Sequence, residues 1–149
     1  GKFVESKEFP YKLDWFKRLK ACFESNFKPS DPLVWLGDLN VAPEPRDVFD
    51  PDSKHHHVCF HEDARNALKD VMSWGFVDVF RKHCDQPGQY SFWDYRAKNT
   101  VEKNKGWRID HIMATEKLAE KSSACYIDKQ PRLREKPSDH TPVIAEFQL

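Results

Sequence analysis

The stretch LVWLGDLN at residues 33–40 decides the fold, because it joins a short apolar run to a polar end. The run at residues 33–36 is typical of a buried strand. Asp38 and Asn40 follow it and alternate across Leu39, so in an extended backbone their side chains point the same way. A carboxylate beside an amide suits hydrolysis, since the acid can orient or deprotonate water while the amide donates to a phosphate oxygen. The alternative is an Asx turn that ends the strand.

Helices and further strands are expected on both sides of this strand. In residues 10–27, four apolar side chains recur at helical spacing and form one face: Leu13, Phe16, Leu19 and Phe23. The other expected elements are a helix at residues 61–74 and strands at residues 107–113, 123–127 and 142–147. Residues 76–80 either extend the second helix or form a short edge strand. Alternating strands and helices favour an α/β fold built from layers.

Two more segments place polar residues beside an expected strand. GWRIDHI at residues 106–112 holds Asp110 among apolar residues, where an unpaired acid is costly, so it needs a histidine or a metal as partner. The alternative is an ion pair with Arg108 or another base. In SDH at residues 138–140, Asp139 and His140 would face opposite sides of a strand, one toward a metal and the other toward a substrate. A serine-hydrolase triad is a poor interpretation, because neighbours in sequence cannot form one.

Length, charge and cysteines exclude several classes of protein. The chain has 149 residues, enough for one domain, and its 24 basic and 24 acidic residues leave no net charge that would indicate nucleic-acid binding. Its four cysteines form no CxxC pair, which argues against a thiolate zinc site and favours reduced thiols in a cytoplasmic protein. No apolar run reaches the roughly 20 residues of a membrane span, and no signal peptide is visible.

The order of GDLN, GWRIDHI and SDH resembles the exonuclease III family of DNA-repair nucleases, which belongs to the endonuclease/exonuclease/phosphatase superfold. Four further stretches share the resemblance, at residues 47–51, 72–81, 90–96 and 135–140, so it covers nearly the whole chain. The resemblance is strongest to the bacterial branch. It implies a DNA-repair hydrolase, with 3′-5′ exonuclease and abasic-site endonuclease activity that serves base excision repair.

The resemblance also assigns roles residue by residue. Asp38 matches the acid that activates the attacking water, and Asn40 matches the amide that holds the scissile phosphate. His140 matches the histidine that contacts the phosphate, and Asp110 matches its carboxylate partner. Asp139 matches a metal-binding acid. The family carries rival assignments of base and metal ligand, so Asp38 is also a candidate ligand. The implied cofactor is Mg²⁺, with Mn²⁺ as the other possibility, since a Mg²⁺ site needs only one or two carboxylates besides water.

The implied partner is DNA, either a duplex with an abasic site or a 3′ end. Phe92, Trp107 and Ile109 match positions that line a pocket for a base-free sugar, where aromatic walls would reject an intact nucleotide on size. Arg96 and Arg108 bound a basic loop that suits contact with the phosphate backbone. Ordinary core packing and a solvated loop are the respective alternatives. The three histidines at residues 55–57 are interpreted as solvated.

The first half of the family pattern is absent from residues 1–149, including a metal-binding glutamate and a phosphate-contacting tyrosine. We therefore expect one partial domain, the C-terminal half of the four-layer sandwich, with an apolar inner sheet face that the missing N-terminal half or a second copy would cover. An isolated chain of this kind is expected to be catalytically incomplete. Two alternatives stay open: a non-catalytic half-domain that self-associates, and a small-phosphoester phosphatase of the same superfold.

Overall fold

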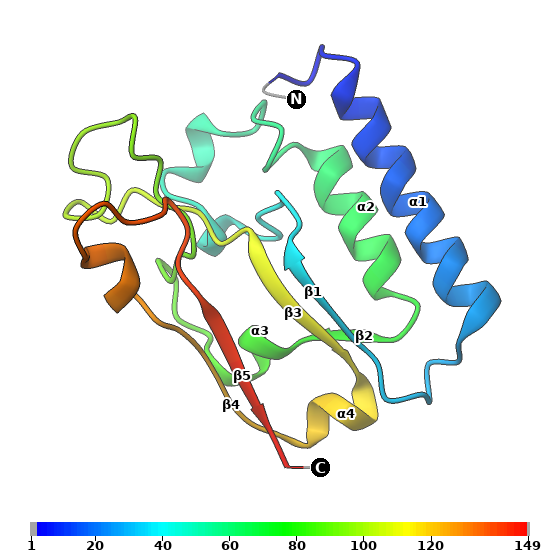
Figure 1. The fold of residues 1–149 in the computed structure, drawn as a ribbon. Coiled ribbons are helices and arrows are strands. Elements are labelled where there is room, and N and C mark those ends of the chain that lie inside the picture. The colour runs from blue at the N-terminus through cyan, green and yellow to red at the C-terminus, as the bar shows by residue number, and fades with distance from the viewer. Residues whose placement is uncertain (1–2, 149) are drawn as a thin grey trace.

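The computed structural model describes residues 3–148 (Figure 1). Its helices and strands are α1 Glu8–Asn26, β1 Val34–Asp38, α2 Glu62–Met72, β2 Phe76–Asp78, α3 Val79–His83, β3 Asp110–Thr115, α4 Glu116–Glu120, β4 Ser122–Ile127 and β5 Val143–Phe147. Short 3-10 helices lie at Pro45–Asp47, Pro51–Ser53 and Gln130–Leu133. Within these described residues, no helix is long and apolar enough to cross a membrane.

The strands form two antiparallel groups. Three strands pair in the order β1-β3-β2, and β4 pairs with β5, which runs beside β3 (Figure 1). Because β1 and β3 are antiparallel, the end of β1 meets the start of β3, and Asp38 is paired in register with Asp110. The strand expected at residues 107–113 begins only at Asp110, so this acid opens its strand and does not lie in its middle.

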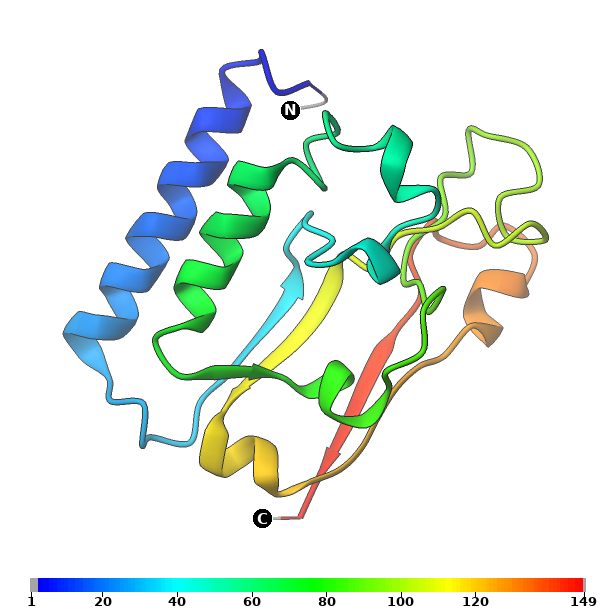
Figure 2. The ribbon, with the colours of Figure 1, turned by 180° about the vertical axis from the view of Figure 1, so that it is seen from behind.

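Helices α1 and α2 lie side by side and cover one face of the three-stranded sheet (Figures 1 and 2). The expected apolar face of α1 is confirmed, since Phe16 is buried and Phe23 packs against the same core. The ring of Phe23 lies 4.8 Å from that of Phe76 and 6.1 Å from that of Trp35, so one aromatic cluster joins the helix to two strands. This arrangement is the expected α/β layer pair.

The short helices α3 and α4 build a smaller core on the β4–β5 side. Phe80 and Leu118 pack there with Ile112 and Cys125. Residues 76–80 combine strand β2 with the start of α3, so neither of the two expected alternatives describes them fully. No sequence pattern indicates α4, because a helix of five residues is too short to show a period.

The opposite face of the sheet is apolar and is open along β1, whereas Ile112 and Ala114 of β3 are buried on that face. On β1, Trp35 points into the core and is 9% exposed, whereas Leu36 points away and is 63% exposed. Val34 is also exposed, and a hollow of about 590 Å³ lies between it and Phe147. Within residues 3–148 no element covers Val34 or Leu36, which agrees with an apolar inner sheet face at this strand.

Candidate active site

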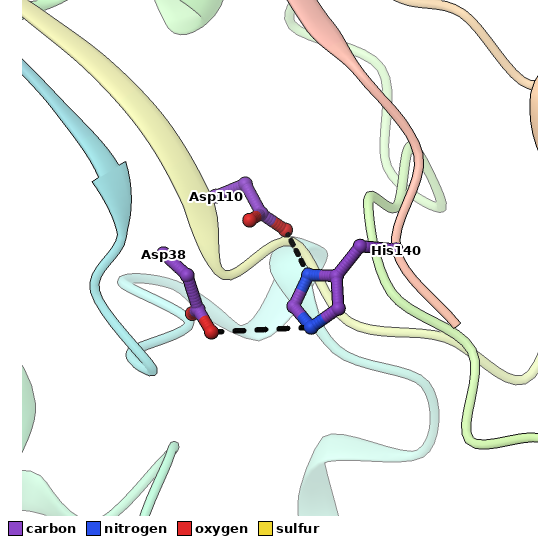
Figure 3. A group of neighbouring side chains, drawn as sticks. All are labelled: Asp38, Asp110 and His140. Atoms are coloured by element: carbon purple, nitrogen blue, oxygen red, sulfur yellow. Dashed lines mark hydrogen bonds and ion pairs between the residues drawn. The ribbon is translucent and has the colours of Figure 1, made fainter. Parts of the chain in front are cut away.

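Three side chains from different parts of the chain converge at one end of the β1–β3 pair (Figure 3). Asp38 ends β1, Asp110 opens β3, and His140 precedes β5. Each offers one oxygen or nitrogen atom, and these atoms lie within 4.8 Å of one another. The structure thus brings together residues that are up to 102 positions apart in sequence.

The imidazole of His140 is held by Asp110. Its Nδ1 lies 2.8 Å from Asp110 Oδ2, so Nδ1 carries the proton and donates a hydrogen bond to the carboxylate. The Nε2 atom is then directed toward Asp38, 3.9 Å from Oδ2 (Figure 3). The hydrogen bond to Asp110 is the main cause that raises the pKa of His140, against the opposing effect of burial. A cationic imidazole with a free Nε2–H can donate to an anionic oxygen.

Asp38 and Asn40 form a compact turn. The backbone N–H of Asn40 donates to Asp38 Oδ1 and its side-chain amide donates to Oδ2, both at 2.9 Å. The two side chains meet as expected, but through the Asx turn that was the alternative to an extended backbone, because Asn40 has a left-handed φ of 51°. The turn follows because β1 ends at Asp38 and asparagine tolerates this conformation better than most residues. Partial burial, reinforced by the charge of Asp110, raises the pKa of Asp38.

Ser91 forms hydrogen bonds to the two segments that carry Asp110 and His140. Its hydroxyl accepts hydrogen bonds from the backbone N–H groups of Ile109 and Asp110, each at 3.2 Å. Its carbonyl accepts one from the N–H of Thr141 at 2.8 Å. The buried Ser91 therefore connects the segment that carries Asp110 with the segment that carries His140.

A hollow of about 420 Å³ opens beside the three side chains. It is bounded by Asn40, Phe92, Trp107, Ile109 and His140. Arg96 and His57 also lie on its wall. The three residues expected around a sugar pocket thus share one cavity with the two expected at the phosphate.

His57 is exposed, as expected of the three histidines at residues 55–57, but one side of its ring packs at the hollow. Its ring lies 4.5 Å from that of Trp107, and its Nδ1 accepts a hydrogen bond from the N–H of Cys59. Burial is the main cause that lowers the pKa of His57. A run of three histidines carries no periodic signal, so the sequence could not single out this one.

Arg108 does not lie on a surface that DNA can reach, and its expected contact with phosphate is corrected here. The side chain is 1% exposed, with Nε 2.6 Å from Asp47 Oδ1 and Nη2 2.8 Å from Asp78 Oδ2. Its Nη1 lies 3.1 Å from the Nδ1 of the buried His111. The guanidinium is buried because two carboxylates compensate its charge. Arg108 therefore pairs with acids in the interior, although not with Asp110.

Arg96 and Asp139 occupy the margin of the site. Arg96 is exposed and forms a two-pronged ion pair with Asp94. Asp139 does not belong to the cluster of Asp38, Asp110 and His140. Its carbonyl accepts a hydrogen bond from Trp93, which places its backbone against the loop that carries Phe92.

The donor atoms of the cluster fit a divalent cation. Asp38 and Asp110 offer carboxylate oxygens, and hard oxygen donors suit Mg²⁺ or Mn²⁺, which retain several waters. His140 is the less suitable ligand for Mg²⁺, and its Nδ1 is already bonded to Asp110. The carboxylates are therefore the groups that would hold the ion.

Comparison with known proteins places this geometry in a family. The model of the endonuclease/exonuclease/phosphatase family matches residues 10–140. Exodeoxyribonuclease III of Haemophilus influenzae is 33% identical over 147 residues, which cover 94% of this chain and 55% of the relative. The solved structure of an AP endonuclease from Archaeoglobus fulgidus superposes with a TM-score of 0.96 and 48% identity, over 100% of this chain and 58% of that one.

A third similar protein is a phosphatase. The structure of the 3′ phosphatase NExo from Neisseria, bound to a product DNA hairpin, has a TM-score of 0.92 and 30% identity, over 100% of this chain and 58% of that one. The chain thus spans about half the length of the relatives it matches. That share agrees with the expectation of half of a four-layer sandwich.

Proposed function

We propose, from the premise that this chain belongs to the endonuclease/exonuclease/phosphatase family, that it carries the acid, amide and histidine of a Mg²⁺-dependent DNA-repair nuclease. The reaction is hydrolysis of DNA phosphodiesters at abasic sites and from 3′ ends. One observation carries the proposal: the His140 ring, fixed by Asp110, faces Asp38 beside a hollow walled by aromatic residues.

The groups of the site have separate roles in this reaction. Asp38 orients the attacking water and accepts its proton, which suits a carboxylate whose pKa is raised by burial. The Asn40 amide and the Nε2–H of His140 donate to the non-bridging oxygens of the phosphate as charge grows there. A new P–O bond to the water oxygen forms while a P–O bond to a sugar oxygen breaks. A bound Mg²⁺ would supply positive charge at the phosphate and the leaving oxygen.

The hollow provides a basis for selecting the substrate. Phe92 and Trp107 present aromatic walls, and Ile109 closes the cavity on one side. A deoxyribose without its base would fit against such walls, whereas a nucleotide that keeps its base would first have to unstack from the adjacent bases. The exposed Arg96, at the edge of the hollow, would contact the DNA backbone. The role of Asp139 as a metal ligand remains part of this proposal and needs its carboxylate to turn toward Asp38.

The open face of the β1–β3 sheet needs a partner in the assembled enzyme. We treat residues 1–149 as one partial domain, whose exposed Leu36 and Val34 would pack against a second α/β layer pair. That layer pair comes from the remaining half of the fold or from a second copy of this chain. Sedimentation analysis distinguishes the two, since only the second copy would make the purified chain a dimer that Leu36→Asp dissociates. A folded monomer whose association Leu36→Asp does not change would remove the second copy from the proposal.

Phosphomonoester hydrolysis is the second candidate, favoured by the similarity to the Neisseria 3′ phosphatase. The same water, amide and histidine would act on a terminal phosphate. Its substrate would be a DNA 3′ end or, for a phosphatase of the wider superfold, a small phosphoester.

Comparing three substrates tests the proposal: a duplex with one abasic site, a duplex with a 3′-phosphate, and p-nitrophenyl phosphate. The nuclease proposal expects the chain, once assembled with its second layer pair, to incise the first in Mg²⁺. Turnover of the second alone would make the protein a DNA 3′ phosphatase, and turnover of the third alone would make it a small-molecule phosphatase.

A further inference from the structure

A lysine of helix α1 reaches two loops of the candidate active site. Lys12 Nζ lies 2.6 Å from the carbonyl oxygen of Asn40 and 3.0 Å from that of Val58. The three residues are far apart in sequence, so one ammonium group connects the helix, the turn after β1 and the loop before α2. Lys12 is partly buried, and both of these hydrogen-bond partners are main-chain carbonyls.

The turn that Lys12 holds is the one that positions the catalytic amide. Asn40 adopts a left-handed φ of 51°. A residue with a Cβ adopts this backbone conformation only at a cost in free energy, which its surroundings must offset. In that conformation its N–H and its amide both bond to Asp38. A charge-assisted hydrogen bond to the Asn40 carbonyl stabilises the peptide in the orientation that these contacts need.

The position of Asn40 affects both sides of the site. Asn40 and Val58 line the hollow with Trp107, and they also line a second hollow of about 480 Å³ beside Lys12 and Asp38. A change in the Asn40 turn would therefore alter the amide, the carboxylate that it contacts and the walls of both hollows.

We propose that Lys12 is a positioning residue that holds Asn40 in its left-handed turn and thereby aims the Asn40 amide and the Asp38 carboxylate at the substrate. This inference deepens the proposed nuclease function and rests on it for its catalytic consequence. The effect on Asn40 is independent of catalysis and is testable without activity.

Lys20 provides a matched control on the same helix. Its Nζ lies 2.6 Å from Asp70 Oδ1 on α2, so it joins two helices and touches no residue of the site. Both lysines are partly buried and both lose a polar contact when changed to methionine. A general effect of losing a lysine contact from α1 would appear in both variants.

Amide hydrogen exchange of the ¹⁵N-labelled chain tests the positioning role. In Lys12→Met, we expect exchange of the Asn40 amide to accelerate roughly tenfold or more and its side-chain NH₂ resonances to shift, because the bonds to Asp38 loosen. Lys20→Met should leave both unchanged, and Lys12→Arg should restore them in part, because a guanidinium can donate to both carbonyls. Unchanged Asn40 signals in a folded Lys12→Met variant would overturn the proposal.

Incision of an abasic-site duplex tests the consequence for catalysis. We expect Lys12→Met to lower kcat by about tenfold or more with little change in KM, as for a misplaced catalytic group, while Lys20→Met acts as the wild type. An unaltered kcat in a variant whose Asn40 signals have moved would show that the turn is held but is not needed for the reaction, which would contradict the proposal. Absence of incision by the wild type assembled with its second layer pair would contradict the nuclease function, whereas the exchange result would still decide what Lys12 does.

Discussion

Asp38 and Asp110 are direct cross-strand partners at the end of the β1–β3 pair, so two carboxylates lie next to each other at one edge of the sheet. Like charges in such proximity favour protonation of one acid or the binding of a cation. His140 compensates part of this negative charge through its hydrogen bond to Asp110. The charge of Asp110 also contributes to the raised pKa of Asp38. The antiparallel register thus creates both the acid–histidine pair and the candidate metal site.

Replacing Asp110 should lower the pKa of His140. The hydrogen bond to Asp110 is the main cause of the raised value, so Asp110→Asn removes a charge that favours the imidazolium. NMR titration of the His140 ring protons measures the change, and incision should fall by roughly 100-fold with it. A His140 pKa that stays where it is in the wild type would show that Asp110 does not control the ring.

A divalent cation should bind at the two facing carboxylates. Mn²⁺ should broaden the NMR signals of residues around Asp38 and Asp110, and Asp38→Asn should weaken that effect by about tenfold or more. Asp63→Asn, which removes an exposed acid of α2, is the matched control and should change nothing. Asp139→Asn measures whether the third acid contributes. Broadening that survives Asp38→Asn unchanged would place the ion elsewhere.

Arg108 should matter for stability, and Arg96 for DNA. Arg108→Met leaves Asp47 and Asp78 without their buried partner, which should cost about 3–5 kcal/mol of unfolding free energy. Arg96→Met breaks an exposed pair and should cost less than about 1 kcal/mol while weakening binding to an abasic duplex. Urea unfolding and fluorescence anisotropy measure the two effects. Equal losses of stability in both variants would contradict the assignment of Arg108 to the interior.

His111 should make the fold sensitive to mild acid. Burial, with the charge of Arg108, lowers the pKa of His111 to about 4, so between that value and its ordinary 6.5 the unfolded chain binds a proton that the folded chain does not. Stability should therefore fall as pH drops from about 6.5 to 4, by about 3 kcal/mol at most from this group. His140, whose pKa is raised, contributes with the opposite sign, so the comparison is made with His111→Gln. A wild type and a variant with the same pH profile would contradict this account.

Much of this arrangement could be predicted from the sequence, because it follows from the spacing of apolar residues and from short motifs. The helical spacing of Phe16 and Phe23 gave α1, and the apolar run before Asp38 gave β1. The three motifs gave Asp38, Asp110 and His140 as candidates, and the structure shows that their side chains meet. The distances between them could not be predicted, since they depend on antiparallel register and on loops fastened by Ser91.

The remaining features depend on contacts that no local pattern reports. Lys12 looks like any lysine of an amphipathic helix, and only the fold brings it to the carbonyl of Asn40. Arg108 follows a basic loop in sequence, yet it is buried because it forms ion pairs with Asp47 and Asp78, which lie 61 and 30 positions before it in the sequence. Alternation across Leu39 leaves an extended backbone and an Asx turn both open at Asn40, because it cannot distinguish a strand from its end, and the structure shows the turn.

Incision of a duplex that carries one abasic site, measured with the chain assembled with its second α/β layer pair, in Mg²⁺ and in EDTA, tests the central claim most directly. We expect incision that requires Mg²⁺ and falls by at least about 100-fold in Asp38→Asn, while the exposed-acid variant Asp63→Asn retains it. Incision by the assembled protein that persists in EDTA or in Asp38→Asn, or its absence from that assembled protein when it binds Mn²⁺ at Asp38, would contradict the assignment of this cluster as a metal-dependent phosphodiester-cleaving site.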